Sequence, residues 1–102
     1  MSTLMVNGAP VTEAHIEERM AFYGLPDYMA NGMFLYLVHR IEPGSFMTAL
    51  LSNNLRESVA CADKNNARCL KEWVQFMYCE LPSGSWGSPQ QVQAWLAERT
   101  VA

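Results

Sequence analysis

LKEWVQFMYCEL, residues 70–81, has the clearest helical periodicity in the chain. Its apolar side chains recur at i, i+3, i+4, i+7 and i+11, the spacing of one α-helical face: Leu70, Trp73, Val74, Met77 and Leu81. The polar side chains between them fall on the opposite face: Lys71, Glu72 and Gln75. This pattern predicts an amphipathic helix over about residues 67–80 that packs against a hydrophobic core.

Two further helices are predicted before this one. Thr12 is a suitable N-cap for the first, and Gly24 is typical of the residue that follows a helix end. Pro26 suits the first position of the second helix, which we expect to cover about residues 26–40. That helix is apolar on nearly all sides, so it should be central and mostly buried. Gly32 in its middle indicates close approach by a neighbouring helix.

Two short helices are predicted in the middle of the chain. Ser45 is a suitable N-cap for the first of them. The second should cover residues 55–62, and its inward-facing residues should be Leu55, Val59 and Ala62. Residues 63–66 are expected to form a polar turn, in which Asn66 caps the following helix.

The two ends of the chain complete the predicted fold. Ser88-Pro89, with Gln91 three residues after the serine, is a capping-box signature for a last helix. Asn7-Gly8 between short apolar pairs favours a tight turn, so residues 1–11 should form a hairpin or an extended arm. We therefore expect one all-α domain over residues 1–102, in which residues 12–99 form a compact bundle of five to six short helices.

The composition predicts a protein in which some apolar side chains remain on the surface. Of the 102 residues, 50% are hydrophobic and 17% are charged, whereas typical soluble domains have about 25% charged residues. A small domain has much surface, so some apolar side chains should be left for a partner or a second copy of the chain. No apolar run approaches the roughly 18 residues of a membrane span, and the first residues do not resemble a signal peptide. We therefore expect a cytoplasmic protein.

The sequence contains no recognisable catalytic or metal-binding pattern. His15 and His39 lack ligand-type spacing to cysteines or carboxylates. The odd number of cysteines fits neither a disulfide framework nor a zinc motif, so Cys61, Cys69 and Cys79 are expected to be small buried apolar residues. Without a paired nucleophile and base or a glycine-rich phosphate loop, we expect a protein that is not an enzyme and needs no cofactor or metal.

Nucleic-acid binding is the alternative function, and the charge disfavours it. The net charge is −3 and most Lys and Arg residues are scattered, whereas nucleic-acid binding needs clustered cations. Lys64, Arg68 and Lys71 fall at the spacing of one helix face and would be the contact residues. Asp63 and Glu72 flank this face and weaken its positive field.

Trp86, the methionines and Arg40 each allow two interpretations. Trp86 either packs at the start of the last helix or stands exposed as a binding anchor. Arg40 suits the negative end of the central helix, and it becomes a binding candidate if it is exposed beside Phe46 or Trp86. Several methionines fall at helical core positions, where core packing is favoured over an adaptable binding face: Met20, Met29, Met33, Met47 and Met77.

Four phrases of the sequence form a wider pattern: LPDYM at residues 25–29, IEPGSFMTALLSNNLRE at 41–57, AD at 62–63 and WGSP at 86–89. Over about residues 25–96 this pattern resembles a family of small proteins carried by phages, prophages and plasmids. The chain departs from the family pattern at Asn54, where the family has Asp, and at Gln90, where it has Glu. Both departures remove negative charge, which puts any acidic role at position 54 in doubt.

The resemblance implies an accessory protein of a mobile genetic element. Such proteins often act by binding a host protein, for example a component of a defence or regulatory complex. The residues expected to form the partner-binding surface are Arg40, Phe46, Asn53, Asn54, Arg56 and Trp86.

Overall fold

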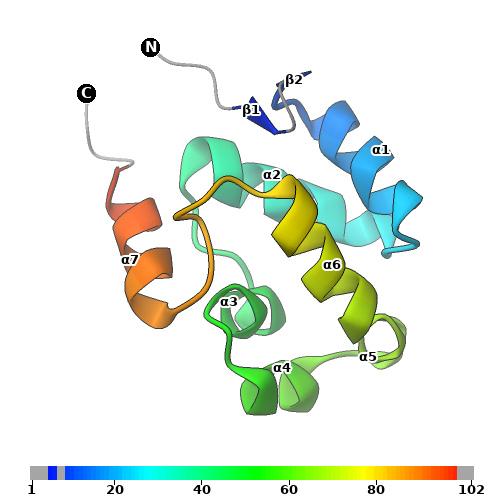
Figure 1. The fold of residues 1–102 in the computed structure, drawn as a ribbon. Helices are drawn as coiled ribbons and strands as arrows, with labels where there is room; N and C mark the ends of the chain where they lie inside the picture. Colours follow the sequence, from blue (N-terminus) through cyan, green and yellow to red (C-terminus); the bar gives the residue numbers. More distant parts are fainter. Residues whose placement is uncertain (1–4, 7–8, 99–102) are drawn as a thin grey trace.

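The computed structural model describes residues 5–6 and 9–98 and confirms the predicted all-α architecture (Figure 1). The helices follow in the order α1 (Glu13–Phe22), the 3-10 helix η1 (Asp27–Met29), α2 (Ala30–His39), α3 (Ser45–Leu51), α4 (Leu55–Cys61), α5 (Lys64–Arg68), α6 (Leu70–Glu80) and α7 (Pro89–Ala97). Within this described part, no helix has both the length and the apolar character needed to cross a membrane.

A short strand pair precedes the helices. β1 (Met5–Val6) and β2 (Ala9–Pro10) pair in antiparallel fashion, with Met5 opposite Pro10 and Val6 opposite Ala9. This pairing agrees with the predicted hairpin. The expected turn residues Asn7 and Gly8 lie outside the described residues, as do residues 1–4 and 99–102.

Helix α1 begins and ends where the sequence predicts. The Thr12 hydroxyl accepts a hydrogen bond from the backbone N–H of His15 at 3.0 Å, so Thr12 is the N-cap. At the other end Gly24 has φ +76°, in the left-handed region that glycine tolerates best. The N–H of Leu25 bonds the carbonyl of Met20, and the N–H of Gly24 bonds that of Ala21. These two bonds are the Schellman arrangement expected at such an end.

The predicted helix over residues 26–40 is in fact two helices. Pro26 is extended, with φ −62° and ψ 129°, and the chain passes through η1 before α2 begins. Arg40 ends α2 in the left-handed region, with φ 57°. The expected close approach at Gly32 is wrong for the described residues, because a Cβ added there would meet no atom within 4 Å.

Helix α2 is central, as its composition predicts. Met33, Tyr36 and Leu37 are fully buried. Two hydrogen bonds connect this helix to the C-terminal part of the chain. The Tyr36 hydroxyl donates to the carbonyl of Ser85 at 2.5 Å, and the indole N–H of Trp95 donates to the carbonyl of Tyr36 at 3.0 Å. The predicted methionine positions also belong to the core, with Met20, Met33, Met47 and Met77 buried and Met29 packed against them.

The α3–α4 region differs from the prediction in two ways. Gly44, not Ser45, is the N-cap of α3, so Ser45 is already the first helical residue. Leu55, Val59 and Ala62 were expected to face inward. Ala62 packs against the core, but Leu55 and Val59 are 72% and 54% exposed. The residue that α4 buries is Ser58, whose hydroxyl donates to the carbonyl of Asn54 at 2.6 Å. Helical spacing therefore predicted the helix correctly, but two of its three expected inward-facing residues are exposed.

Residues 63–69 also differ from the prediction. The expected polar turn forms α5, capped by Asp63, whose carboxylate accepts from the N–H of Asn66 at 2.8 Å. Asn66 is not a cap, because it is buried and its side-chain carbonyl accepts from the indole N–H of Trp73 at 2.8 Å. The expected helix over residues 67–80 starts at Leu70, because the backbone of Cys69, with φ −124°, interrupts it.

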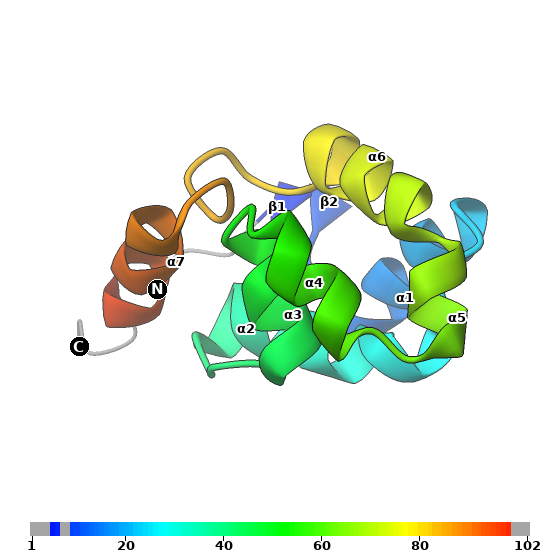
Figure 2. The same cartoon turned by 90° about the horizontal axis from the view of Figure 1, so that it is seen from below.

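The buried face of α6 follows most of the prediction, because Trp73, Met77 and Leu81 are buried and Leu70 packs against the core. It consists of Trp73, Phe76, Met77 and Glu80, whereas Val74 is 49% exposed. Helix α7 begins as predicted, with the Ser88 hydroxyl accepting from the N–H of Gln91 at 3.1 Å and Pro89 in the first turn. Figure 2 shows α4 between two other parts of the molecule: α6 lies on one side of it, and the connection between α2 and α3 lies on the other.

Candidate protein-binding surface

Phe46, a predicted partner-binding residue, belongs to the core. It is only 8% exposed, and its ring meets that of Trp73 edge to face, with centroids 6.1 Å apart. A side chain so deeply buried has little surface to offer a partner. The structure therefore gives no support to Phe46 as a partner-binding residue.

Arg40 is occupied by contacts within the fold. Its guanidinium lies over the ring of Trp95, 3.6 Å from the centroid, and one nitrogen donates to the Trp95 carbonyl and to Glu98, each at 2.9 Å. The Arg40 side chain is 13% exposed. Arg40 was a binding candidate on the condition that it is exposed beside Phe46 or Trp86, whereas it joins the end of α2 to α7. Its role is to hold these two helices together.

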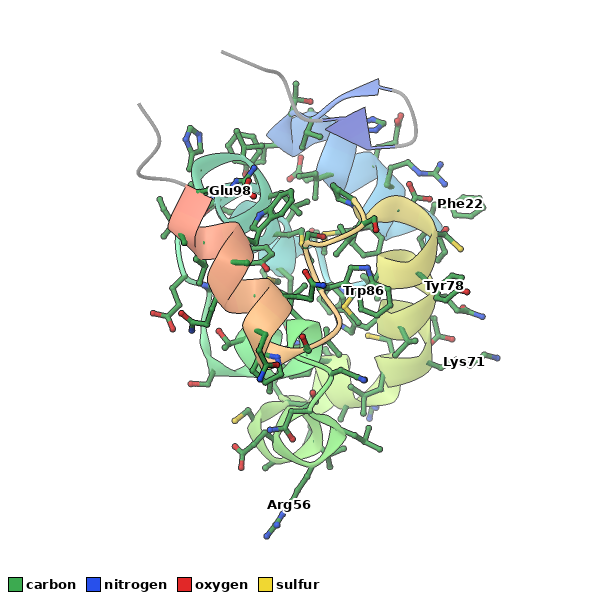
Figure 3. All side chains as sticks on the ribbon, turned by 60° about the vertical axis from the view of Figure 1, so that its left-hand side comes forward. Phe22, Arg56, Lys71, Tyr78, Trp86 and Glu98 are labelled. Carbon is green, nitrogen blue, oxygen red and sulfur yellow. The ribbon has the colours of Figure 1, made fainter. Side chains whose placement is uncertain are left out.

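Asn53, Asn54 and Arg56 lie together at the exposed corner between α3 and α4. Asn53 has φ 62°, and the Asn54 side chain accepts from the N–H of Glu57 at 3.1 Å, which makes it the N-cap of α4. Structural roles therefore account for both asparagines. Arg56 extends away from the body of the protein (Figure 3).

Trp86 lies half-buried between α6 and this corner. Its ring meets that of Tyr78 at 66°, with centroids 6.3 Å apart, and both are labelled in Figure 3. The next residue, Gly87, donates its N–H to the carbonyl of Leu51 at 2.7 Å, which fastens the loop to the end of α3. Trp86 therefore contacts α6 through Tyr78 while its neighbour is fixed to α3.

Four exposed apolar side chains form two helical rows, one on α4 and one on α6. Leu55 and Val59 are four residues apart on α4, and Val74 and Tyr78 are four residues apart on α6, so each pair shares one helix face. Tyr78 is 79% exposed. We call this set the Trp86 surface: Leu55, Val59, Val74, Tyr78 and Trp86.

The position of α4 places its apolar row toward α6. Glu57 and Cys61 line a groove of about 420 Å³ together with Pro43, so they lie on the flank of α4 that faces the α2–α3 connection. Helical geometry puts Leu55 and Val59 on the other flank. Leu55 and Val59 therefore lie on the flank of α4 on whose side α6 is seen in Figure 2.

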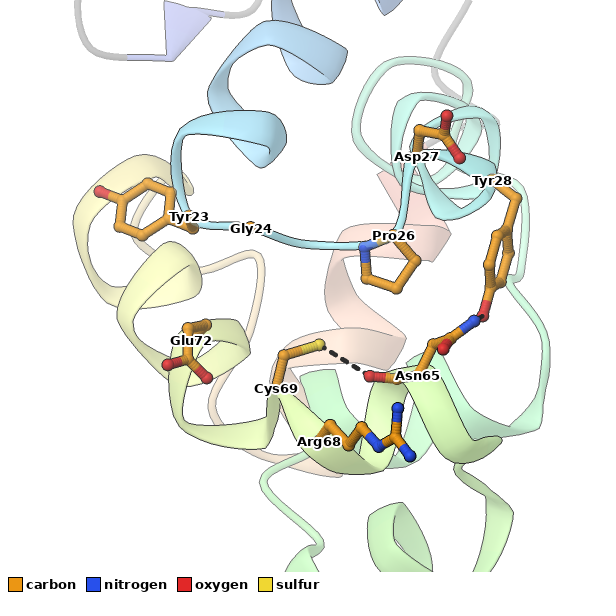
Figure 4. Close-up of a pocket in the computed structure, with 9 residues that line it drawn as sticks. All are labelled: Tyr23, Gly24, Pro26, Asp27, Tyr28, Asn65, Arg68, Cys69 and Glu72. Atoms are coloured by element: carbon orange, nitrogen blue, oxygen red, sulfur yellow. Dashed lines mark hydrogen bonds between the residues drawn. The ribbon is translucent and has the colours of Figure 1, made fainter.

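A second feature is a pair of grooves on either side of Tyr28. One, of about 560 Å³, lies between the segment that follows α1 and the helices α5 and α6 (Figure 4). The other, of about 400 Å³, includes Gly32 and Phe46 in its lining. The Tyr28 hydroxyl donates to Asp63 at 2.5 Å, and this bond is the main reason that the pKa of Asp63 is lowered. Three of the quoted sequence phrases meet here, because 25–29, 43–47 and 62–63 all contribute residues.

The predicted nucleic-acid face is divided in the structure. Lys64, Arg68 and Lys71 are all exposed, but the break at Cys69 puts Lys71 on α6 and the other two on α5. Arg68 lines the groove of Figure 4 together with the carboxylates of Asp27 and Glu72. Nearby negative charge of this kind repels a phosphate backbone.

The cysteines only partly follow the prediction. Cys69 is buried, its thiol donates to the carbonyl of Asn65 at 3.2 Å, and burial raises the pKa of that thiol. Cys61 and Cys79 are exposed, so the expectation that they are core residues is wrong. His15 lies on α1 and His39 on α2. Within residues 5–6 and 9–98, no three His, Cys, Asp or Glu side chains are grouped as a metal site would require.

Comparison with known proteins gives no match: no protein family, no curated protein and no solved structure is similar to this chain. We therefore infer the function from the geometry of the molecule itself. Of the residues that the sequence singled out, Asn53, Asn54, Arg56 and Trp86 lie at or beside the Trp86 surface. Sequence reasoning missed its remaining members, Leu55, Val59, Val74 and Tyr78. The charged residues beside them, Arg56 and Lys71, were the available signal.

Proposed function

We propose that this chain is a non-catalytic accessory protein of a mobile genetic element, which binds a host protein in the cytoplasm and modulates it. The exposed Trp86 surface is the observation that supports this most. Leu55 and Tyr78 are 72% and 79% exposed. Burying an aliphatic or aromatic side chain of this size stabilises a complex by roughly 1.5–3 kcal/mol. A partner that covers both helical rows would therefore gain a substantial binding free energy.

The surface is also well ordered for binding. Its members lie on α4 and α6 or on a loop that the Gly87–Leu51 hydrogen bond fixes to α3. Little conformational entropy is lost when such a surface binds, which favours affinity. A defence or regulatory complex of the host is the class of partner that the resemblance to mobile-element proteins implies.

The experiment is quantitative capture from host lysate with a tagged chain. The wild-type protein should retain a host protein at near-stoichiometric level, and the Leu55→Glu/Tyr78→Glu variant should lose it. Ile41→Glu is the matched control, because Ile41 is a 40% exposed apolar residue on the α2–α3 connection, away from the surface. It should retain the host protein.

Two results would overturn the proposal. The first is the absence of any host protein near stoichiometric level in the wild-type capture. The second is equal capture by the wild type and by the Leu55→Glu/Tyr78→Glu variant. Circular dichroism of each variant verifies that the loss of binding is not a loss of folding.

A further inference from the structure

The shape of the Trp86 surface favours one kind of occupant. Leu55 with Val59, and Val74 with Tyr78, are rows of side chains at i and i+4, the ridges between which the side chains of another helix pack. Within the described residues these rows have no covering helix, because Leu55, Val59 and Tyr78 are each more than half exposed. A helix with an apolar face has the shape to pack between rows of this kind.

Each apolar row has a cation at its edge. Arg56 is three residues before Val59 on α4, and Lys71 is three residues before Val74 on α6, so each is a surface neighbour of the apolar residue. Both side chains project outward in Figure 3. Neither Arg56 nor Lys71 forms an ion pair among residues 11–98, whereas Arg19 and Arg40 are paired with Glu80 and Glu98.

The nearby carboxylates lie away from these cations. Asp63 accepts from the Tyr28 hydroxyl, Glu72 lines the groove of Figure 4, and Glu57 lines the groove beside Pro43. The apolar rows are thus bordered by positive charge, although the whole chain has a net charge of −3. Charges at the rim of an interface select the partner and its orientation.

We propose that the Trp86 surface binds an amphipathic helix of the partner, with acidic residues at the edges of its apolar face. This inference rests on the proposed function and adds the chemistry of the partner to it. The acidic residues would pair with Arg56 and Lys71, while aliphatic or aromatic residues would cover Tyr78 and Leu55. A nucleic acid would pair with the cations but leave the apolar rows exposed, so it fits the surface less well.

The test uses the full chain as bait against a displayed library of random helix-forming peptides. Enriched peptides should be net negative, with apolar residues three or four positions apart. Arg56→Glu/Lys71→Glu should raise their Kd by at least about tenfold. Lys64→Glu/Arg68→Glu is the matched control, since it changes the net charge equally but alters α5. It should change the Kd by less than about threefold.

The other outcomes contradict the inference. Enrichment of neutral or basic peptides, or of no peptide at all, would contradict the proposal that the partner helix is acidic. Equal losses of peptide affinity in the two charge variants would contradict it as well. Competition of the bound peptides by duplex DNA would support the nucleic-acid alternative instead. The host-capture result with Leu55→Glu/Tyr78→Glu does not depend on peptide charge, so the proposed function can survive when this inference fails.

Discussion

The Arg19 guanidinium makes two hydrogen bonds to the Glu80 carboxylate, 3.1 Å from Nε to Oε1 and 2.8 Å from Nη2 to Oε2. The Tyr23 hydroxyl donates to the same carboxylate at 2.9 Å. Glu80 is only 3% exposed and lies on the otherwise apolar inner face of α6. This cluster therefore ties α1 to α6 through a buried charge.

The stability of the fold should depend on the ionisation of Glu80. Burial acts to raise its pKa, but the hydrogen bonds from Arg19 and Tyr23 outweigh it and hold the pKa of Glu80 below the ordinary value of 4.5. A depressed pKa in the folded state adds stability above the unfolded-state pKa, and this stability is lost as pH falls through the folded-state pKa. We expect the free energy of unfolding to decrease as the solution is acidified below pH 4.5.

Glu80→Gln isolates this contribution. The variant should be less stable than the wild type by about 2 kcal/mol at neutral pH, because a charged acceptor is replaced by a neutral one. The difference should shrink as the wild-type carboxylate is protonated. Urea unfolding at neutral and acidic pH measures it, and a difference that stays constant with pH would contradict this account.

Asn66, which forms a buried hydrogen bond with Trp73, should contribute more to stability than the exposed asparagine beside it. Asn66→Ala would leave the indole N–H of Trp73 without its partner in a fully buried position, which costs about 1–3 kcal/mol. Asn65→Ala is the control, since Asn65 is exposed and should change stability by less than about 0.5 kcal/mol. Thermal unfolding compares them, and equal effects would show that the bond contributes little.

Arg40 should affect stability and not partner binding. Arg40→Ala removes the stacking on Trp95 and the bonds to its carbonyl, so it should destabilise the fold by about 1–2 kcal/mol. At a temperature where the variant remains folded, host-protein capture should be unchanged. A loss of capture with intact stability would restore Arg40 as a binding residue.

Gly32→Ala should stabilise the protein. The added Cβ meets open space, and alanine is favoured over glycine inside a helix by roughly 1 kcal/mol. The midpoint of urea unfolding should therefore rise. A decrease would mean that another chain, or a part of this one outside residues 5–6 and 9–98, packs closely against Gly32.

Local chemistry made part of the fold predictable. Thr12 and Ser88 cap helices, and Gly24 ends one, because each satisfies backbone groups within a few residues. The break at Cys69 was not visible, because no glycine or proline marks it. The bond between Asn66 and Trp73 joins α5 to α6 across this break.

The candidate site was less predictable for a physical reason. The spacing of Leu55 and Val59 identifies a helix face but cannot tell whether that face meets the core or water. An apolar helix face that binds a partner has the same spacing in the sequence as one that packs in the core. Trp73 packs against Phe46 and Trp95 against Arg40, and the local sequence does not show these contacts between distant residues.

Site-specific photo-cross-linking in host cells shows whether the Trp86 surface contacts a host protein. A photoreactive phenylalanine analogue replaces Tyr78 in one variant and Ile41 in another. The account predicts a discrete adduct with one host protein from position 78 and none from position 41. No adduct at position 78, equal adducts at both positions, or an adduct only with a second copy of the chain would contradict it.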